Sequence, residues 1–271
     1  MNFNLLAKIN FGSLFTVVGI VAVIAIVFAL LIVLVSKLCF VKADEKAEAV
    51  LSHLAGANCG GCGYAGCADF AKAVAEGKAQ FTACGPTSNE DKAEIANILG
   101  LPFTAGEKMV ATVHCAGGKV CLNKYDYVGN EGCSAQMALL GGSKVCPNGC
   151  LGAGSCEANC PFHAIKVVDG VSYVNKALCT ACGVCVNTCP KKIVDLIPAS
   201  SKVYVACSTV CKGKEVMNMC KVGCIGCGLC AKNCPNNAIT MVNNVAVIDY
   251  SKCTGCKVCV GKCPRKCIKE F

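Results

Sequence analysis

Twenty-eight cysteines among 271 residues are the part of this chain most able to do chemistry. Many of them are separated by two intervening residues in short runs that end in proline, so their sulfurs converge on one point. Such spacing is typical of metal ligands, whereas a disulfide framework in a small secreted protein does not need it. The chain reads CTACGVCVNTCP at residues 179–190 and CTGCKVCVGKCP at residues 253–264. Both match C-x2-C-x2-C-x3-C-P, the run that binds [4Fe-4S] clusters in bacterial ferredoxins.

In two-cluster ferredoxins, the fourth cysteine of each run binds the cluster of the other run. The stretch CKVGCIGCGLCAKNCP, residues 220–235, supplies the partner of the run at 253–264. The two sets expected for this module are Cys224, Cys227, Cys230 and Cys263, and Cys253, Cys256, Cys259 and Cys234. Between the runs, AITMVNNVAVID predicts two short strands joined by a turn at Asn243-Asn244.

An earlier stretch, CPNGCLGAGSCEANCP at residues 146–161, is an imperfect copy of residues 220–235. It is followed by AIKVVDGVSYVN, which predicts a matching strand pair with Asp169-Gly170 at its turn. Crossed pairing gives one ordinary set for this module: Cys160, Cys179, Cys182 and Cys185. Loop, helix and strand are therefore expected twice in each module, related by a pseudo-twofold axis.

The second set of the earlier module is incomplete, because Ala153 stands where the later copy has Cys227. The cysteines that remain are Cys150, Cys156 and Cys189. We expect Cys146, four residues before Cys150, to replace the missing ligand. Two alternatives stay open, namely a [3Fe-4S] core held by three cysteines and a fourth ligand from elsewhere in the chain.

A separate group of cysteines precedes both modules, with the spacing C-x2-C-x4-C-x16-C. Its members are Cys59, Cys62, Cys67 and Cys84. Glycine in this loop lets backbone amides approach the sulfurs, which suits a further [4Fe-4S] cluster, and a Cys₄ zinc site is the alternative.

Gly61, Gly63 and Gly66 also spell the dinucleotide fingerprint G-x-G-x-x-G. No strand leads into it and a cysteine, Cys62, fills its first variable position, so we do not expect nucleotide binding here.

Flanking patterns predict helices around this group. ADEKAEAVLSHLAG, residues 43–56, reads as a short helix closed by glycine, and another helix is expected to begin near Ala68. Ser88 followed by Asp91 resembles a capping box for a helix over Asn89–Leu99.

Several cysteines are left over, and the duplication extends to some of them. ATVHC ends at Cys115 as VYVAC ends at Cys207. Further candidate ligands, for a sixth cluster, are Cys115, Cys133, Cys207 and Cys220. Buried, inert thiols are the alternative for this group, and for Cys121 and Cys211 as well. About five [4Fe-4S] clusters are thus expected, or six if these cysteines bind one. The three histidines, His53, His114 and His163, form no ligand-spaced pair and are expected to be structural.

Charge is distributed unevenly along the chain, whose formal net charge is +9. Residues 199–271 alone carry 11 Lys and Arg against 3 Asp and Glu, a net charge of +8. Two oxidised clusters with their thiolates would contribute about −4, so this module stays near +4. It is therefore the expected docking region for an acidic partner, and a solvated lysine-rich face is the alternative reading. No nucleic-acid partner is expected.

The residues INFGSLFTVVGIVAVIAIVFALLIVLVS, 9–36, contain no charge and are long enough to span a bilayer. A signal peptide would have a shorter apolar region and a small-residue cleavage site, and Leu38 before Cys39 does not suit a lipoprotein signal. One uncleaved anchor is therefore expected. Lys8 precedes the span, whereas Lys37, Lys42 and Lys46 follow it, which places the rest of the chain in the cytoplasm by the positive-inside rule.

Together these patterns predict an α+β chain with a single N-terminal transmembrane helix, a small helical 4Fe-4S domain and two tandem ferredoxin-like modules of the bacterial 2[4Fe-4S] type. The expected boundaries are 1–40 for the anchor, 41–110 for the helical domain, 111–145 for a connecting segment, 146–200 for the first module and 201–271 for the second.

An anchor, then C-x2-C-x4-C-x16-C, then ferredoxin runs closely resembles the RnfB family of the Rnf electron-transport complex over essentially the whole chain. GCLGAGSCEANCPF, residues 149–162, is similar to the variant first run of members from anaerobes. Two modules in place of one depart from the shorter members. The resemblance implies an electron-transfer subunit of an ion-translocating ferredoxin:NAD⁺ oxidoreductase in the cell membrane. It would take electrons from reduced ferredoxin, on its basic module, and pass them to other subunits of the complex, which would hold the flavin, NAD⁺ and the ion path.

Two other functions stay open. A membrane-anchored polyferredoxin could serve another redox complex, such as a hydrogenase. A zinc-binding assembly module without redox function is the third hypothesis, which the colour of the protein would separate, since zinc protein is colourless. Acid–base or nucleophilic catalysis by this chain is not indicated.

Overall fold

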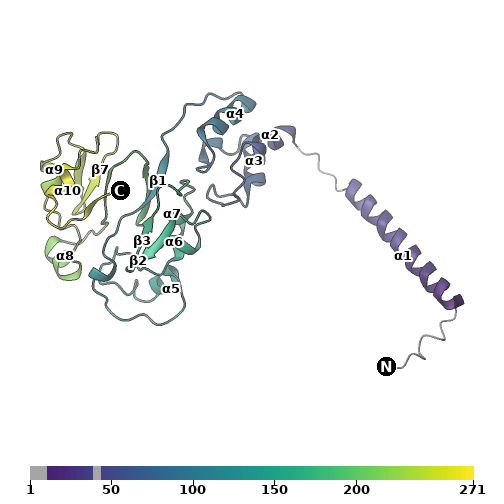
Figure 1. The fold of residues 1–271 in the computed structure, drawn as a ribbon, viewed down its shortest axis with the longest axis horizontal. Helices are drawn as coiled ribbons and strands as arrows, with labels where there is room; N and C mark the ends of the chain where they lie inside the picture. The colour runs from purple at the N-terminus through teal and green to yellow at the C-terminus, as the bar shows by residue number, and fades with distance from the viewer. Residues whose placement is uncertain (1–10, 39–43) are drawn as a thin grey trace. The chain divides into compact units, whose positions relative to one another are not determined.

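The computed structural model describes residues 11–38 and 44–271. The chain divides into two compact units, Met1–Asp44 and Glu45–Phe271. Within the first unit lies one helix, α1 (Phe11–Leu38), whose part from Phe15 to Lys37 is long and apolar enough to cross a membrane (Figure 1). At 1.5 Å per residue its 28 residues reach about 42 Å, more than the roughly 30 Å of a hydrocarbon core.

The second unit begins with a helical part made of α2 (Glu45–Ser52), α3 (Cys67–Ala75) and α4 (Asn89–Leu99), with a 3-10 turn at Phe81–Ala83. Its core holds the buried side chains of Val50, Leu54, Phe70, Val74, Phe81 and Ile95. The predicted helix over Asn89–Leu99 is confirmed. Its N-cap is Ser88, whose hydroxyl oxygen accepts the Asp91 N–H at 3.0 Å. The helix predicted for residues 43–56 is shorter in the structure, and residue 43 lies outside the described residues.

The first ferredoxin-like module consists of two antiparallel strand pairs and two short helices. The elements are β1 (Met109–Val113), β2 (Ile165–Val168), β3 (Val171–Val174), β4 (Val194–Pro198), α6 (Ser155–Ala158) and α7 (Val184–Thr188). β2 pairs with β3, and β1 pairs with β4. β1 therefore comes from the segment upstream of residue 146, where the sequence predicted only a connection. That segment also contains a 3-10 turn, Gly118–Val120, and α5 (Cys133–Ala138).

The second module repeats this plan. Its elements are β5 (Val203–Val205), α8 (Gly213–Met219), α9 (Leu229–Lys232), β6 (Ile239–Val242), β7 (Val245–Ile248), α10 (Val258–Lys262) and β8 (Ile268–Glu270). β6 pairs with β7 and β5 with β8, so the pairing order matches that of the first module. The inner cores of the two modules are built from valine, isoleucine, alanine and cysteine.

Both predicted hairpin turns are confirmed. In each, two residues with positive φ join strands of four residues: Asp169 (51°) and Gly170 (75°) in one, Asn243 (46°) and Asn244 (66°) in the other. Positive φ at both central residues defines the type I′ turn, whose twist matches that of the flanking strands. Asx and glycine residues tolerate this backbone region better than other residues.

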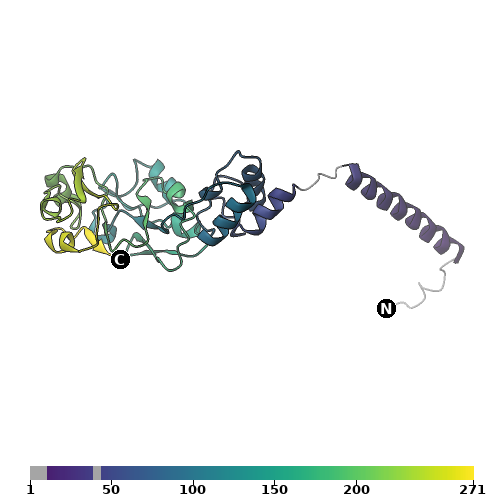
Figure 2. The same ribbon diagram turned by 90° about the horizontal axis from the view of Figure 1, so that it is seen from above.

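Within Glu45–Phe271 the helical part, the first module and the second module follow one another, as both views show (Figures 1 and 2). The helical part packs on the first module through two glycines. A Cβ added at Gly61 would lie 1.9 Å from the carbonyl oxygen of Cys182, and one at Gly85 would lie 2.2 Å from that of Ala181. The two modules meet where His114 Nδ1 lies 2.7 Å from the carbonyl oxygen of Val205.

We predict that Gly61→Ala weakens the packing of the helical part on the first module, because the new methyl group overlaps a backbone oxygen that cannot move alone. Overpacking of this kind costs about 1–3 kcal/mol in the free energy of unfolding. Anaerobic calorimetry of the full chain measures the loss. Gly106→Ala is the matched control, because a Cβ there meets nothing within 4 Å. Equal stability of the two variants would contradict this interface.

Candidate metal centres

The loop and helices of the helical part bring Cys59, Cys62, Cys67 and Cys84 around one cavity with about 310 Å³ of open space. Cys67 begins α3, and its backbone N–H donates to the side-chain oxygen of Asn58 at 2.8 Å. Cys84 follows the 3-10 turn and is buried. Cys182 of the first module also lines this cavity. The sequence predicted the four cysteines as one set, and the structure adds the neighbouring thiol.

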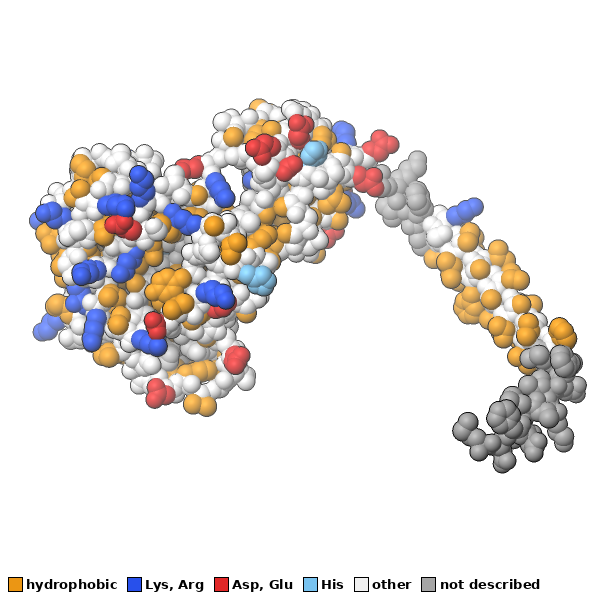
Figure 3. Space-filling view, in the orientation of Figure 1, with side chains coloured by type: hydrophobic (Ala, Val, Ile, Leu, Met, Phe, Trp, Pro, Cys, Tyr) orange, Lys and Arg blue, Asp and Glu red, His pale blue; other side chains and the backbone are white. Residues whose placement is uncertain are grey.

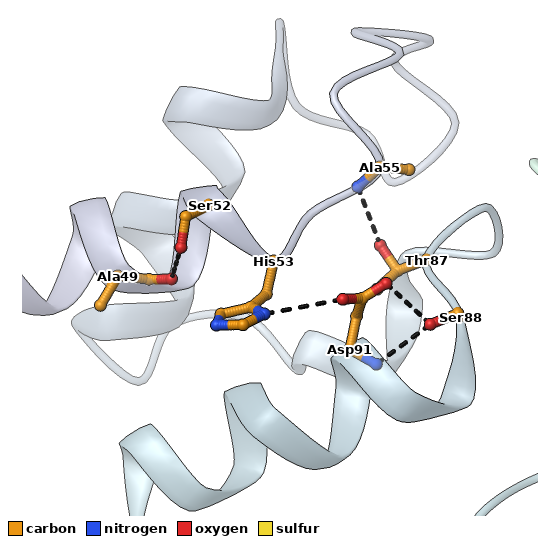
Figure 4. A network of polar contacts seen from close by, with 7 residues as sticks. All are labelled: Ala49, Ser52, His53, Ala55, Thr87, Ser88 and Asp91. Carbon is orange, nitrogen blue, oxygen red and sulfur yellow. Dashed lines mark hydrogen bonds and ion pairs between the residues drawn. The ribbon is translucent and has the colours of Figure 1, made fainter.

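Thr87 connects Cys84 to the segment that follows α2, and Figure 4 shows its hydrogen bond with Ala55. Its hydroxyl donates to Cys84 Sγ at 3.1 Å and accepts the Ala55 N–H at 3.3 Å. The side chain is 4% exposed, so water does not replace these partners. On the surface beside it, Asp91 lies 3.6 Å from His53 Nδ1 and accepts the Ser88 hydroxyl. Thr87 had no role predicted from the sequence, since a single threonine carries no recognisable signal.

The first module gathers Cys160, Cys179, Cys182 and Cys185 around a second cavity of about 310 Å³. Backbone amides point at these sulfurs: the Ala164 N–H donates to Cys160 Sγ at 3.3 Å and the Ala111 N–H to Cys179 Sγ at 3.4 Å. Burial raises the pKa of the Cys185 thiol to about 12. A thiolate at that depth needs a positive partner or amide donors, which is what a metal group and these N–H bonds provide.

The second module contains two cavities of the same kind. One, with about 310 Å³ of open space, is lined by Cys224, Cys227, Cys230 and Cys263. The other, of about 330 Å³, is lined by Cys234, Cys253, Cys256 and Cys259. Both sets match those predicted from the crossed spacing. Among the described cysteines, only Cys227 and Cys256 are exposed, so each cavity approaches the surface at one corner.

A fifth thiol, Cys267, enters the first of these two cavities. It is 1% exposed, and its Sγ lies 3.5 Å from Cys263 Sγ. The hydrogen bond that it donates lowers the pKa of Cys263 to about 5. In the first module the equivalent residue is Ile193. The two positions correspond because the Ile193 carbonyl oxygen accepts the His114 N–H in the first module, and the Cys267 carbonyl oxygen accepts the Ala206 N–H in the second. The sequence reasoning gave Cys267 no role, although the comparison with Ile193 would have singled it out.

The thiols near the incomplete set of the first module differ from those expected. Cys150, Cys156 and Cys189 belong to the core of the module, and Ser172 Oγ lies 3.1 Å from Cys156 Sγ. Burial is the main cause that raises the pKa of Cys156, and charge on the neighbouring thiols of Cys150, Cys133 and Cys189 raises it further. The Cys133 N–H donates to Ser155 Oγ at 2.7 Å, so the first residues of α5 and α6 meet at this point.

Cys146, the residue expected to complete that set, lies in another core with Cys121 and Cys220. Cys115 and Cys207 line a cavity with these three thiols. Of the candidates left over from the sequence, the structure therefore brings Cys133 to the first module's set and the others together at a separate place.

The cavities fit a cluster better than a single ion. Four sulfurs bound to one zinc ion at about 2.3 Å would lie within about 4 Å of one another. Within the part of the chain that the structure describes, no group of three or more His, Cys, Asp or Glu side chains is arranged to hold a metal ion. The sites offer soft sulfur donors and amide N–H groups, a donor set that suits iron–sulfur clusters.

Comparison with known families agrees with this chemistry. Residues 54–86 match the family described as putative Fe-S cluster, residues 172–195 match the 4Fe-4S binding domain, and residues 223–267 match the 4Fe-4S dicluster domain. These ranges contain three of the predicted groups of cysteines.

Three relatives, all RnfB proteins, align with most of the chain. The RnfB protein of the ion-translocating oxidoreductase complex of Methanosarcina acetivorans is 40% identical over 237 residues, which cover 87% of this chain and 90% of that protein. Its counterpart in the Na⁺-translocating ferredoxin:NAD⁺ oxidoreductase complex of Acetobacterium woodii is 41% identical, with 87% and 71% covered. The counterpart in the proton-translocating ferredoxin:NAD⁺ oxidoreductase complex of Clostridium ljungdahlii is 37% identical, with 89% and 86% covered.

We predict that Thr87→Val destabilises the helical part by about 0.5–1.5 kcal/mol, since it removes the acceptor of the part-buried hydrogen bond from the Ala55 N–H. It also removes the hydroxyl donor to Cys84 Sγ, so a redox group bound there should become harder to reduce, on the order of tens of millivolts. Thr87→Ser keeps the hydroxyl and serves as the control. Calorimetry and an EPR-monitored redox titration measure both effects, and a Val variant that behaves like the Ser variant would contradict this role.

Proposed function

Because this chain belongs to the RnfB family of ion-translocating oxidoreductase complexes, we propose that it is the electron-transfer subunit of a membrane-bound, ion-translocating ferredoxin:NAD⁺ oxidoreductase. The observation that carries the proposal is the series of thiol-lined cavities within Glu45–Phe271. The series begins at an exposed, basic module and ends in the helical part. No side chain of the chain is needed for acid–base chemistry in this function.

Five sets of cysteines would hold five [4Fe-4S] clusters. The sets are Cys59, Cys62, Cys67 and Cys84; Cys160, Cys179, Cys182 and Cys185; Cys133, Cys150, Cys156 and Cys189; Cys224, Cys227, Cys230 and Cys263; and Cys234, Cys253, Cys256 and Cys259. A bound cluster supplies one-electron redox chemistry. The chain's own contribution is to hold the thiolates, exclude water and set the potential through amide and hydroxyl donors such as Thr87 and Ser172.

The second module suits the input of electrons from reduced ferredoxin, an acidic donor. Its lysines are largely exposed, and Lys and Arg side chains gather over this module in Figure 3, whereas Asp and Glu gather over α2–α4. Exposed Cys256 stands beside two of the cations: Lys257 follows it, and the Lys202 side chain packs within about 3 Å of the Cβ position of Gly255. A positive surface around an exposed redox corner would attract and orient an acidic protein.

The opposite end suits the transfer of electrons to other subunits. In the first module Cys182 corresponds to Cys256, yet it is covered by the helical part instead of exposed. The same corner that faces a soluble donor in one module thus faces the Cys59 loop in the other. Electrons leaving the helical part would reach membrane subunits, which would contain the flavin, the NAD⁺ site and the ion path.

The anchor would be a single span formed by α1, with every thiol-lined cavity on the cytoplasmic side. Its apolar length supports the span, and the lysines at 37, 42 and 46 support the orientation. That side is also where reduced ferredoxin and NAD⁺ are found, so the proposed location and reaction agree.

The test uses anaerobically prepared native membranes with and without this chain. Reduction of NAD⁺ by reduced ferredoxin should disappear without the chain and return with it, and dependence on sodium would distinguish a sodium-coupled from a proton-coupled complex. Unchanged activity would refute the proposal and favour an anchored polyferredoxin that serves another complex.

For docking, we predict that Lys202→Glu weakens ferredoxin binding by about three- to tenfold at low ionic strength and by less at high ionic strength. Lys72→Glu, an equal change of charge on α3 of the helical part, should leave the dissociation constant unchanged. Binding of ferredoxin to the solubilised, cluster-loaded chain measures both. Equal weakening by the two variants would indicate net charge alone and contradict docking at this site.

For the incomplete set, we predict that Cys133→Ala converts one [4Fe-4S] cluster into a [3Fe-4S] form or loses it. Ser134→Ala, an exposed neighbour on the same helix, should change nothing. EPR of the oxidised protein detects the [3Fe-4S] signal, and iron analysis detects a lost cluster. A Cys133 variant with the full iron content and no [3Fe-4S] signal would show that another residue is the fourth ligand.

A further inference from the structure

Cys267 is buried beside the proposed site of Cys224, Cys227, Cys230 and Cys263 without belonging to that set. It lines the same cavity and is 1% exposed. Its Sγ lies 3.5 Å from Cys263 Sγ, and its side chain also forms a hydrogen bond with Cys224. A fifth sulfur therefore contacts two of the four proposed ligands from a place that water does not reach.

The set beside Cys267 is complete without it. A [4Fe-4S] cluster takes four thiolates, and the cysteine that completes each set is the one followed by proline, as at Cys160, Cys189, Cys234 and Cys263. A thiolate that binds a cluster has lost its proton and can only accept hydrogen bonds. The proton between Cys267 and its two neighbours therefore belongs to Cys267, which donates it to one or the other.

The position of Cys267 occurs in all four cysteine runs, always four residues after the cysteine that precedes proline. The four residues are Ala164, Ile193, Ala238 and Cys267, and each is at most 3% exposed. The N–H groups of Ala164 and Ala238 donate to the sulfur of that cysteine, both at 3.3 Å, and the Cys267 N–H forms the same bond with Cys263. The thiol of Cys267 is thus a donor in addition to the one that the backbone supplies.

The fold does not require a thiol at this position, because alanine and isoleucine occupy the other three copies. Of these four residues, Cys267 alone has a side chain that can donate a hydrogen bond. What distinguishes the second module's site is therefore an extra donor to its ligands, and packing alone does not account for it.

The same site contacts residues at which the two modules meet. Arg265 lines its cavity and donates to the carbonyl oxygen of Cys220. Cys220 packs in one core with Cys146, which comes from the first module. The other site of the second module includes exposed Cys256, the corner that suits the entry of electrons.

We propose that Cys267 is a positioning residue that raises the reduction potential of this site, by donating a hydrogen bond to Cys263 or Cys224 without binding the cluster. A donor to a ligand sulfur stabilises negative charge there, and a reduced cluster has one more negative charge than an oxidised one. The thiol keeps its proton and only the electron moves. The consequence for electron flow rests on the proposed function: an electron that enters near Cys256 is drawn to the site that adjoins the first module.

The test measures the reduction potentials of the full chain, purified anaerobically with its clusters, by an EPR-monitored redox titration. Cys267→Ala, which installs the residue found at position 238, should keep the full iron content and lower the potential of one cluster alone. At a fixed potential the ratio of its reduced to oxidised form should fall about three- to tenfold, which is about 30–60 mV for one electron. Cys267→Ser is the matched control, because it keeps a donor and should lose less of the potential.

Ile193→Cys is the reciprocal variant, since it places a thiol at the equivalent position beside Cys189 of the first module. It should raise the potential of one cluster by a similar factor. This variant makes a smaller side chain from a larger one and leaves Cys267 in place, so it decides the question by itself if the Cys267 variants do not fold.

A loss of about four iron atoms from the Cys267→Ala chain would identify Cys267 as a ligand and overturn the proposal. Potentials equal to those of the unmodified chain, in the Cys267→Ala or the Ile193→Cys chain, would overturn it as well. Neither ferredoxin nor NAD⁺ takes part in the titration. Failure of the proposed function would therefore leave the shift in place, and failure of the Cys267 proposal would leave the reduction of NAD⁺ by reduced ferredoxin intact.

Discussion

A cysteine that binds an iron–sulfur cluster must be shielded from water and must also lose its proton, and these two needs oppose each other. Burial raises the pKa of Cys185 and of Cys207 to about 12, so neither would ionise alone near neutral pH. Metal charge and hydrogen-bond donors reverse the balance. The backbone of Glu45–Phe271 supplies such donors repeatedly, through the N–H groups of Ala111, Ala164 and Ala238. Binding of the clusters then contributes directly to folding, which explains how a chain without tryptophan stabilises several small cores.

Duplication lets the same framework serve two purposes. Both modules use two strand pairs, type I′ turns and crossed cysteine runs, yet their outer corners differ. Gly61 and Gly85 allow the helical part to cover Cys182, whereas the equivalent Cys256 is exposed among lysines. The helical part packs over Cys182 of the first module, whereas Cys256 of the second module is exposed. The series of sites therefore has one covered end and one exposed end.

The sequence predicted what depends on neighbours along the chain. The crossed sets of the second module, the turns at Asp169-Gly170 and Asn243-Asn244, and the cap at Ser88 all follow from local spacing or from backbone preferences. It offered Cys133 only as a candidate ligand of a sixth cluster and did not place it beside the first module's set, because the approach of α5 to α6 depends on the fold of a long loop whose residues carry no periodic pattern. Cys146 shows the opposite case. Its position four residues before Cys150 suggested a shared site, but the structure places Cys146 in a core with Cys121 and Cys220. Pairing of β1 with β4 was missed for the same reason, since its partner is about 85 residues away.

Arg265 interacts with two neighbouring groups of cysteines. Its side chain lines the cavity of Cys224 and Cys263, and its guanidinium donates to the carbonyl oxygen of Cys220. The positive charge also helps to lower the pKa of Cys220, after the larger effect of the hydrogen bond from Cys121. A half-buried cation beside a redox site stabilises its more negative, reduced state. The first module has Lys191 in the equivalent place, bonded to the carbonyl oxygens of Gly141 and Pro147. Its ammonium also interacts with the thiols of Cys146 and Cys189, so each module places one cation beside its cysteines at the corresponding position.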